Sequence, residues 1–206
     1  MSRAATNLVV CAGAAWHSRS HPPAVVTGEW HYAAMPEEIV VATTDDDYAA
    51  FGDLIREYWG WLQARYSDLP GFIDAVGGHQ ALDAELSSLR DTFGPPKGLV
   101  LLARRGDLVV GGIACRDLGD GSCEMKRLFV PDRFQGAGTG RRLCQALLDA
   151  ALADGYQAMR LDTGFQNEEA LRMYESLGFR ECPPYHDYPA DLVTHLRFME
   201  KSLAVD

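Results

Sequence analysis

The sequence predicts a mixed α/β domain built on a partly antiparallel sheet. Two patterns indicate this fold class: short apolar or β-branched runs separated by polar turns, and apolar residues that recur every three or four positions. Three consecutive strands are expected before residue 130, and helix and strand then alternate to the end of the chain. A length of 206 residues suits one domain with a sizeable core.

The first elements are a strand and a helix. Residues 38–44 (EIVVATT) are short and β-branched, and the acidic run 45–47 can cap the helix that follows. The apolar face of that helix consists of Tyr48, Phe51, Leu54, Ile55, Tyr58 and Leu62. Pro70 and Gly71 end the pattern.

Later elements follow from the same two patterns. Leucines spaced by three and four predict a helix, and apolar runs separated by the polar turns 104–107 and 119–122 predict a meander of strands. A strongly amphipathic stretch after the glycine-rich turn predicts a helix packed on the sheet. The predicted strands cover 99–103, 108–115, 123–130, 156–161 and 192–199, and the predicted helices cover 80–92, the region around 143–150, and 167–177.

Charge and composition exclude two classes of partner. Lys and Arg total 19 against 29 for Asp and Glu, so a formal net charge of -10 repels a phosphate backbone at long range. No apolar run approaches the ~18 to 20 residues that cross a bilayer. We therefore expect neither nucleic acid nor membrane as a partner.

The cysteines and the start of the chain bear on its compartment. The five cysteines form neither a CxxC pair nor a metal-like spacing with histidine, which favours a reducing cytoplasm and predicts no metal site. Residues 1–37 are expected to be a poorly ordered extension before a domain over 38–206. A targeting segment is the less favoured interpretation, because Asn7 interrupts its apolar stretch.

The sharpest local feature is the glycine-rich turn 135–140 (QGAGTG), which lies between a strand and an amphipathic helix. Glycine adopts positive φ and permits close approach, so successive N–H groups can point at one anion where the helix begins. A pyrophosphate would fit this nest, and a tight turn without a ligand is the alternative. Because Arg141 follows Gly140, the dinucleotide-binding pattern GxGxxG fails.

Two motifs resemble the GNAT superfamily of acyl-CoA-dependent N-acyltransferases. The first is Q/R-x-x-G-x-G/A, which is matched by Gln135, Gly138 and Gly140. The second is N-x-x-A-x-x-x-Y-x-x-x-G-F, which is matched by Asn167, Ala170, Tyr174, Gly178 and Phe179. The resemblance covers roughly residues 38–203 and is strongest over 123–179.

The resemblance implies a central, mostly antiparallel sheet flanked by helices and splayed open between the strands 123–130 and 156–161. Acetyl-CoA would be the co-substrate, with its pantetheine arm in the gap and its pyrophosphate on the glycine-rich turn. A helix N-cap is the alternative role for Asn167. The implied cofactor-binding residues are Leu128, Phe129, Val130, Gln135, Gly136, Ala137, Gly138, Thr139, Gly140, Arg141, Asn167 and Ala170.

The resemblance also implies two catalytic residues. An alkyl amine is almost fully protonated at pH 7, so a general base is expected, and Glu124 occupies the strand position that relatives often give to such a carboxylate. An ion pair with Lys126 or Arg127 is the alternative for Glu124. Tyr174 matches the family's acid, which protonates the leaving thiolate, and an ordinary half-buried tyrosine is its alternative.

The predicted function is transfer of an acetyl group from acetyl-CoA to a primary amine of a small molecule or amino acid, by direct attack in a ternary complex. Acceptor specificity is expected from the aromatic-rich segments 58–66 and 183–191. A non-catalytic acyl-CoA-binding regulatory module and a protein or peptide N-acetyltransferase are the alternatives. A homodimer is one option for the assembly.

Overall fold

A computed structural model describes residues 35–69, 71 and 78–204, and the extension expected at the start of the chain lies largely outside this range. The strands are β1 (Glu37–Val41), β2 (Gly98–Arg105), β3 (Leu108–Asp117), β4 (Ser122–Phe129), β5 (Ala158–Gly164), β6 (Arg180–Glu181) and β7 (Leu196–Ser202). The helices are α2 (Asp45–Arg65), α4 (Gly78–Ser87), α5 (Leu89–Phe93), α6 (Thr139–Ala153), α7 (Glu168–Ser176), α8 (Ala190–Val193) and the 3-10 turn η1 (Asp132–Phe134).

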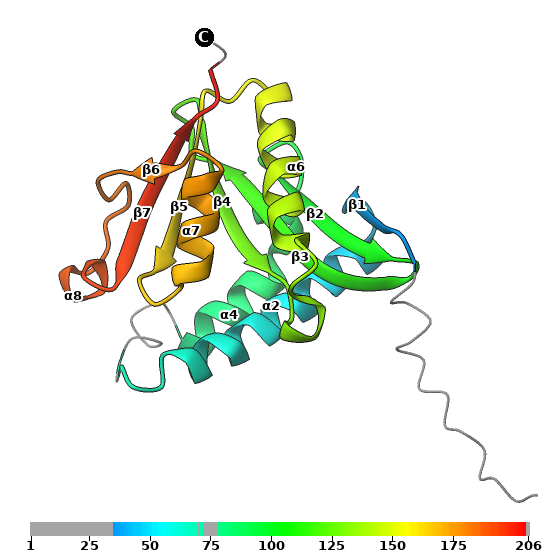
Figure 1. Ribbon diagram of the computed structural model, residues 1–206, viewed down its shortest axis with the longest axis horizontal. Helices are drawn as coiled ribbons and strands as arrows, with labels where there is room; N and C mark the ends of the chain where they lie inside the picture. The colour runs from blue at the N-terminus through cyan, green and yellow to red at the C-terminus, as the bar shows by residue number, and fades with distance from the viewer. Residues whose placement is uncertain (1–34, 70, 72–77, 205–206) are drawn as a thin grey trace, which may run out of the picture.

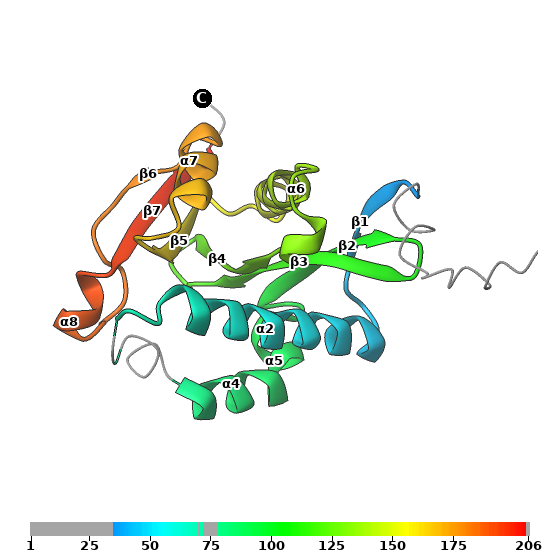
Figure 2. The ribbon, with the colours of Figure 1, turned by 60° about the horizontal axis from the view of Figure 1, so that its bottom comes forward.

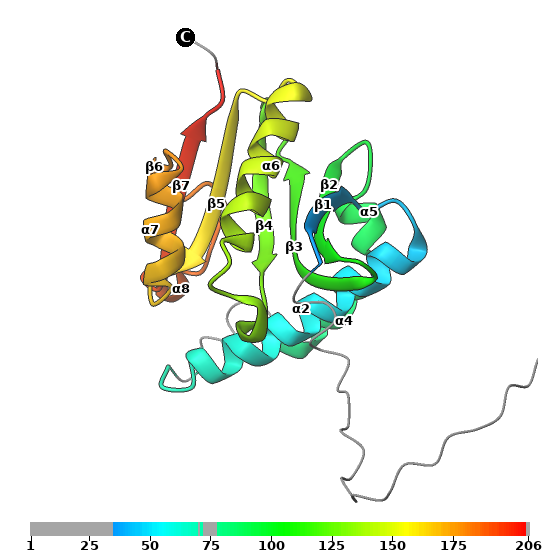
Figure 3. The ribbon, with the colours of Figure 1, turned by 45° about the vertical axis from the view of Figure 1, so that its right-hand side comes forward.

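The strands form one seven-stranded sheet in the order β1-β2-β3-β4-β5-β7-β6. Every neighbouring pair is antiparallel except β4 and β5, which are parallel. These two strands pair only over 122–124 and 158–160, and beyond Glu124 they diverge (Figures 1 and 3). The predicted mixed fold with a mostly antiparallel, splayed sheet is therefore confirmed.

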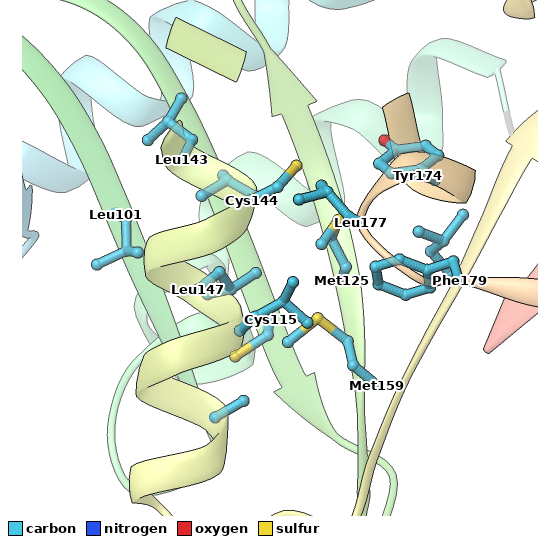
Figure 4. Packing of buried hydrophobic residues seen from close by; sticks show 14 of the residues in the cluster. Leu101, Cys115, Met125, Leu143, Cys144, Leu147, Met159, Tyr174, Leu177 and Phe179 are labelled. Atoms are coloured by element: carbon cyan, nitrogen blue, oxygen red, sulfur yellow. The ribbon is translucent and has the colours of Figure 1, made fainter. Parts of the chain in front are cut away.

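Helices cover both faces of the sheet, as Figure 2 shows: α2, α4 and α5 lie on one face, and α6 and α7 lie on the other. Each face has its own hydrophobic cluster. Phe51 and Ile55 of α2 are central to the first, and Leu143 and Leu147 of α6 are central to the second, part of which is drawn in Figure 4. The apolar faces predicted for both helices are thus the faces that they bury.

Two predicted elements are placed differently, and the two-residue strand β6 was not predicted. The helix expected over 80–92 is divided into α4 and α5 at Ser88, whose hydroxyl donates to the Ala84 carbonyl at 2.9 Å and so competes with the helical backbone pattern. The last strand begins at Leu196, because residues from Ala190 form the short helix α8 directly after Pro189, a residue whose fixed φ suits a helix start.

The start of α2 is closed by a capping box. The Thr44 hydroxyl accepts from the Asp47 N–H at 3.1 Å, and the Asp47 carboxylate accepts from the Thr44 N–H at 2.9 Å. Hydrogen bonds from the Thr43 and Thr44 N–H groups hold the pKa of Asp47 well below its usual range. This stabilisation is complete above the unfolded-state pKa near 4, and it is lost as the pH falls through the lower folded pKa.

We expect Thr44→Ala to lower the free energy of unfolding by about 1 kcal/mol, since it removes one half of the capping box. Chemical denaturation at pH 7 measures the change. Thr43→Ala is the matched control, because Thr43 is equally exposed and only its backbone N–H contacts Asp47. An equal loss in both variants would show that the cap contributes nothing.

Candidate active site

A cavity of about 1020 Å³ lies where β4 and β5 separate. Residues from both helical layers line it. Tyr58, Trp59, Trp61, Leu62 and Arg65 come from α2 on one face, and Gly140, Arg141, Asn167, Ala170, Met173 and Tyr174 come from in and around α6 and α7 on the other. Because β4 and β5 separate here, residues of both helical layers reach the same cavity.

The glycine-rich turn forms one end of this cavity. Gly136 and Gly138 have φ of 84° and 77°, values that other residues adopt only with strain, and Gly138 is the N-cap of α6. Gly140 has ordinary φ, and a Cβ there would lie 3.9 Å from Val130. The Gln135 side-chain amide closes the turn by donating to the Val130 carbonyl at 2.8 Å. Bare backbone thus faces the cavity at the start of α6.

Charged side chains fix the turn from outside the cavity. Glu37 accepts from the Thr139 hydroxyl at 2.9 Å and from Arg142 at 2.5 Å, while Arg142 also donates to the Ala137 carbonyl. Although burial raises the pKa of Glu37, these hydrogen bonds hold it below its ordinary value. Sequence reasoning missed Glu37, because it assigned this residue to the N-terminal extension.

The three predicted phosphate-binding residues that follow the turn's glycines are not all placed alike. Thr139 and Arg141 line the cavity, whereas the Ala137 side chain does not. Arg141 donates to the Ser176 hydroxyl at 2.6 Å, which links the start of α6 to the end of α7. Its charge is therefore held beside the turn.

The open edge of β4 forms the wall next to the turn. Leu128, Phe129 and Val130 all line the cavity, on the part of β4 that has separated from β5. Arg127 has a φ of 57°, and the pairing of β3 with β4 shifts register just there, so the strand contains a bulge. The structure therefore presents unpaired strand backbone to the cavity, on the side that faces β5.

Helix α7 supplies the opposite wall. Asn167, Ala170 and Tyr174, which match the second motif, all line the cavity. Asn167 occupies the N-cap position but makes no capping hydrogen bond: its Nδ2 donates to the Thr163 hydroxyl, and its buried Oδ1 has no partner among the residues described. An acceptor atom is thus left available beside the gap.

Tyr174 is buried, and its ring packs edge-on against Phe179 with the centroids 5.8 Å apart. Figure 4 shows the ring at the margin of the core cluster. Burial raises the pKa of the Tyr174 hydroxyl well above its usual value, and the nearby acidic groups of Cys144, Tyr58 and Asp162 act in the same direction. The phenol therefore keeps its proton throughout the neutral range.

The model of the acetyltransferase (GNAT) family matches residues 53–179, which is more than half of the chain. This protein belongs to the GNAT family. An uncharacterized N-acetyltransferase of Schizosaccharomyces pombe is 35% identical over 120 residues, covering 57% of this chain and 74% of the relative. The IAA acetyltransferase of Azospirillum brasilense is 37% identical over 123 residues, covering 58% and 79%. The protein is thus an acyl-CoA-dependent N-acetyltransferase of the GNAT type.

Solved structures agree in fold. An acetyltransferase from Streptococcus agalactiae superposes with a TM-score of 0.63 at 21% identity, covering 81% of this chain and 98% of its own. The acetyltransferase yncA from Salmonella typhimurium, solved with acetyl-CoA, gives 0.56 at 20% identity, covering 83% and 96%. The paia N-acetyltransferase from Thermoplasma acidophilum, in complex with coenzyme A, gives 0.58 at 18% identity, covering 82% and 99%.

In this GNAT domain Glu124 lies behind the cavity wall. Its side chain is 0% exposed and it does not line the cavity. One carboxylate oxygen accepts from Arg116 at 2.7 Å. The other accepts from Lys126 at 3.4 Å and the Tyr185 hydroxyl at 3.1 Å, and lies 3.0 Å from His186 Nε2. Of the two ion pairs weighed for Glu124, the one with Lys126 is therefore present.

Arg127, the other partner weighed for Glu124, pairs instead with Glu85 through two hydrogen bonds of 2.7 and 2.6 Å. Burial alone would lower the pKa of Arg127, but the Glu85 carboxylate raises it above its ordinary value. The bulge at Arg127 places this pair beside the Tyr58 and Trp59 rings of α2. The charge of Arg127 is thus compensated next to the cavity.

Both segments expected to set acceptor specificity reach the cavity, α2 through Tyr58 and Trp61, and the stretch before β7 through Tyr188 and Pro189. Sequence reasoning missed Asp162 of β5, which also lines it. The signal available in the sequence was a charged residue directly after the predicted strand 156–161, which borders the expected gap in the sheet.

Neither a metal cluster nor a membrane-spanning helix is found where the chain is described. Over residues 35–69, 71 and 78–204, no group of three or more His, Cys, Asp or Glu could hold a metal ion. Within the same ranges, no helix has the length and apolar character needed to span a bilayer.

Proposed function

We propose that this protein transfers the acetyl group of acetyl-CoA to a primary amine of a small molecule or amino acid, by direct attack in a ternary complex. The proposal rests on one observation. The same cavity is lined by bare backbone at the start of a helix, by an unpaired strand edge and by Asn167, whose buried Oδ1 has no partner among the described residues. These are the groups that an extended, amide-containing phosphoanhydride would need.

The described residues fit the pyrophosphate and the pantetheine arm of coenzyme A. The N–H groups of the glycine-rich turn and Arg141 would hold the pyrophosphate. Leu128, Phe129 and Val130 would hydrogen-bond the pantetheine amides through their backbone, and Asn167 Oδ1 would accept an N–H. Bound in this way, the co-substrate supplies an acetyl thioester at the split of the sheet.

Tyr174 and Glu124 are proposed to handle protons. The Tyr174 hydroxyl keeps its proton at neutral pH and can donate it to the leaving sulfur atom. Glu124 is fully buried, so a proton from the amine can reach it only through a group that lines the cavity. Lys126, which lines the cavity and bonds Glu124, connects the two.

Direct attack is favoured because no cysteine is among the described residues that line the cavity, and Cys123 and Cys144 are poor nucleophiles. Burial raises the pKa of the Cys144 thiol to about 12. The neighbouring Cys115 thiol, together with burial, raises the pKa of Cys123 far above its ordinary value. Neither thiol would be ionised at neutral pH, as an acetyl-cysteine intermediate requires.

Relatives support a small acceptor. The IAA acetyltransferase of Azospirillum brasilense and the human N-acetylaspartate synthetase, 32% identical over 102 residues, are both named for small molecules. The second match covers only 34% of that relative. We therefore propose the class of acceptor and not its identity.

The test is mass spectrometry of acetyl-CoA with a panel of alkyl amines, amino acids and peptides. Acetylation of free amines faster than of peptides supports the proposal. A protein that binds coenzyme A but acetylates nothing in the panel would instead be a non-catalytic binding module, and preference for peptides would make it a peptide N-acetyltransferase.

We expect Gly136→Ala to weaken acetyl-CoA binding by at least ~10-fold, because a methyl group would displace the pyrophosphate from one or more N–H groups worth ~1.5 to 3 kcal/mol each. Gly155→Ala is the matched control. Both glycines have nearly the same positive φ, 84° and 86°, and open space around the missing Cβ, but only Gly136 lines the cavity.

Both variants should lose a similar ~1 to 2 kcal/mol of stability from backbone strain. Calorimetric titration measures the affinity, and thermal unfolding measures the strain. Equal affinity in the two variants would remove the turn from the binding site.

A further inference from the structure

Asp162 is the carboxylate that the split sheet exposes inside the cavity. It lies on β5, two residues beyond Arg160, the last β5 residue paired with β4. Its side chain is 15% exposed, and it accepts from Lys126 at 2.8 Å and from the Tyr188 hydroxyl at 3.2 Å. The other acidic residues that line the cavity belong to the turn region and the start of α7, namely Asp132, Glu168 and Glu169.

Asp162 is ionised at neutral pH. Burial raises its pKa, but the Lys126 ammonium and its hydrogen bond outweigh burial and leave the pKa below the ordinary value. Lys126 is shared, since it also lies 3.4 Å from Glu124. Two cations, Lys126 and Arg116, therefore face the two carboxylates, and of these two acids only Asp162 lines the cavity, where its carboxylate can accept from a further donor.

The Asp162 carboxylate shares the cavity with two phenols. Tyr58 and Tyr174 both line the cavity, one from α2 and one from α7. After burial, the negative charge of Asp162 is among the causes that raise the pKa of each hydroxyl. The carboxylate is thus within electrostatic reach of the group proposed to protonate the leaving sulfur.

Tyr58 also belongs to an aromatic wall, which it forms with Trp61 and Phe129. The Tyr58 and Trp61 rings are stacked with an interplanar angle of 21° and centroids 6.1 Å apart, and Phe129 lies 5.7 Å from Tyr58 and 6.4 Å from Trp61. All three residues line the cavity. Such a wall favours a flat or apolar body over a strongly polar one.

We propose that the acceptor is a primary ammonium carried on an aromatic or apolar body, that Asp162 binds this ammonium and takes its proton, and that the aromatic wall holds the body. The inference rests on the proposed acetyltransferase function and names its substrate class. Asp162 would then take the amine's proton in place of Glu124, which does not line the cavity and would be a positioning residue that acts through Lys126.

The ammonium loses two protons in becoming an amide, and the first passes to a carboxylate oxygen of Asp162, which frees the nitrogen lone pair. The nitrogen then bonds the acetyl carbon, the carbon–sulfur bond breaks, and Tyr174 gives its proton to the sulfur. The second proton of the nitrogen replaces the one that Tyr174 has given, and Asp162 releases its own to solvent.

Two nearly isosteric probes test the proposal at pH 7. 2-Phenylethylamine is protonated, whereas O-benzylhydroxylamine, with oxygen in place of one methylene, is a weak base and neutral. We expect Asp162→Asn to reduce kcat/KM for 2-phenylethylamine by ~10²- to 10³-fold. For O-benzylhydroxylamine the reduction should be less than about 5-fold, because a neutral amine needs neither counter-ion nor base. Asp162→Glu should restore part of the loss.

The matched control is Glu85→Gln. Glu85 is 14% exposed and pairs with Arg127 much as Asp162 pairs with Lys126, but it does not line the cavity. This variant should reduce the rates with both probes by the same factor. An equal reduction with both probes in Asp162→Asn, or none, would overturn the proposal.

Failure of the inference can be told from failure of the acetyltransferase function. A wild-type protein that acetylates other amines but neither probe would overturn the substrate class alone. A protein that neither binds coenzyme A nor acetylates any amine would overturn the proposed function itself.

Discussion

Replacing Tyr174 by phenylalanine is expected to reduce kcat by ~10²- to 10⁴-fold while the affinity for acetyl-CoA changes little. Phenylalanine keeps the ring that packs on Phe179 but removes the only proton that Tyr174 can give. No described residue is hydrogen-bonded to this hydroxyl, so the fold should not depend on it. Steady-state kinetics, together with calorimetric titration of the cofactor, measure the two effects separately.

Tyr156→Phe is the control for this experiment. Burial likewise raises the pKa of Tyr156, to about 12, but this residue does not line the cavity. Its loss should leave kcat unchanged. Unchanged turnover in Tyr174→Phe would remove the phenol from the chemistry, whereas a parallel loss in both variants would indicate a general effect on folding.

Replacing Glu124 by alanine is expected to lower the free energy of unfolding by about 3 kcal/mol, with loss of activity as a consequence. Removing one member of a buried ion-paired network leaves its partners uncompensated, which typically costs ~3 to 5 kcal/mol. Arg116 is partly exposed, and Lys126 retains its ion pair with Asp162. We therefore expect a loss of stability at the lower end of this range. Urea denaturation at pH 7 measures the change.

Glu57→Ala is the comparison for Glu124→Ala. Glu57 pairs with Arg133 at the surface, where an ion pair is worth ~0 to 1 kcal/mol. If Glu124→Ala were no more destabilising than Glu57→Ala, the buried network would not hold this part of the sheet together. If it remained folded and lost only turnover, Glu124 would act directly in the chemistry.

The sequence predicted most of the elements because they follow from local patterns. The apolar spacing of 48–62 is the buried face of α2, and the spacing of Leu143 and Leu147 is the buried face of α6. The glycine-rich turn also lies where its motif indicated, since a positive φ at Gly136 and Gly138 is a local requirement. In these regions the local apolar spacing and the local backbone requirements were sufficient to predict the structure.

Prediction failed where distant residues decide the structure. Thr139 is held by Glu37, 102 residues away in the chain, so no spacing could reveal that contact. The partners of Glu124 include Tyr185 and His186, which lie in an irregular stretch without periodicity. Asp162 matters only because β5 has left β4 two residues earlier, which is a property of the whole sheet.

The central claim is that the glycine-rich turn holds the pyrophosphate of coenzyme A and thereby places the thioester at the split of the sheet. Calorimetric titration of the wild-type protein with acetyl-CoA and with S-acetylpantetheine, which lacks the pyrophosphate, tests it most directly. We predict one molecule of acetyl-CoA bound per chain, with S-acetylpantetheine at least ~10²-fold weaker, as expected from the loss of two or more charge-assisted hydrogen bonds. Equal affinity for the two compounds, or no heat of binding with acetyl-CoA, would contradict it.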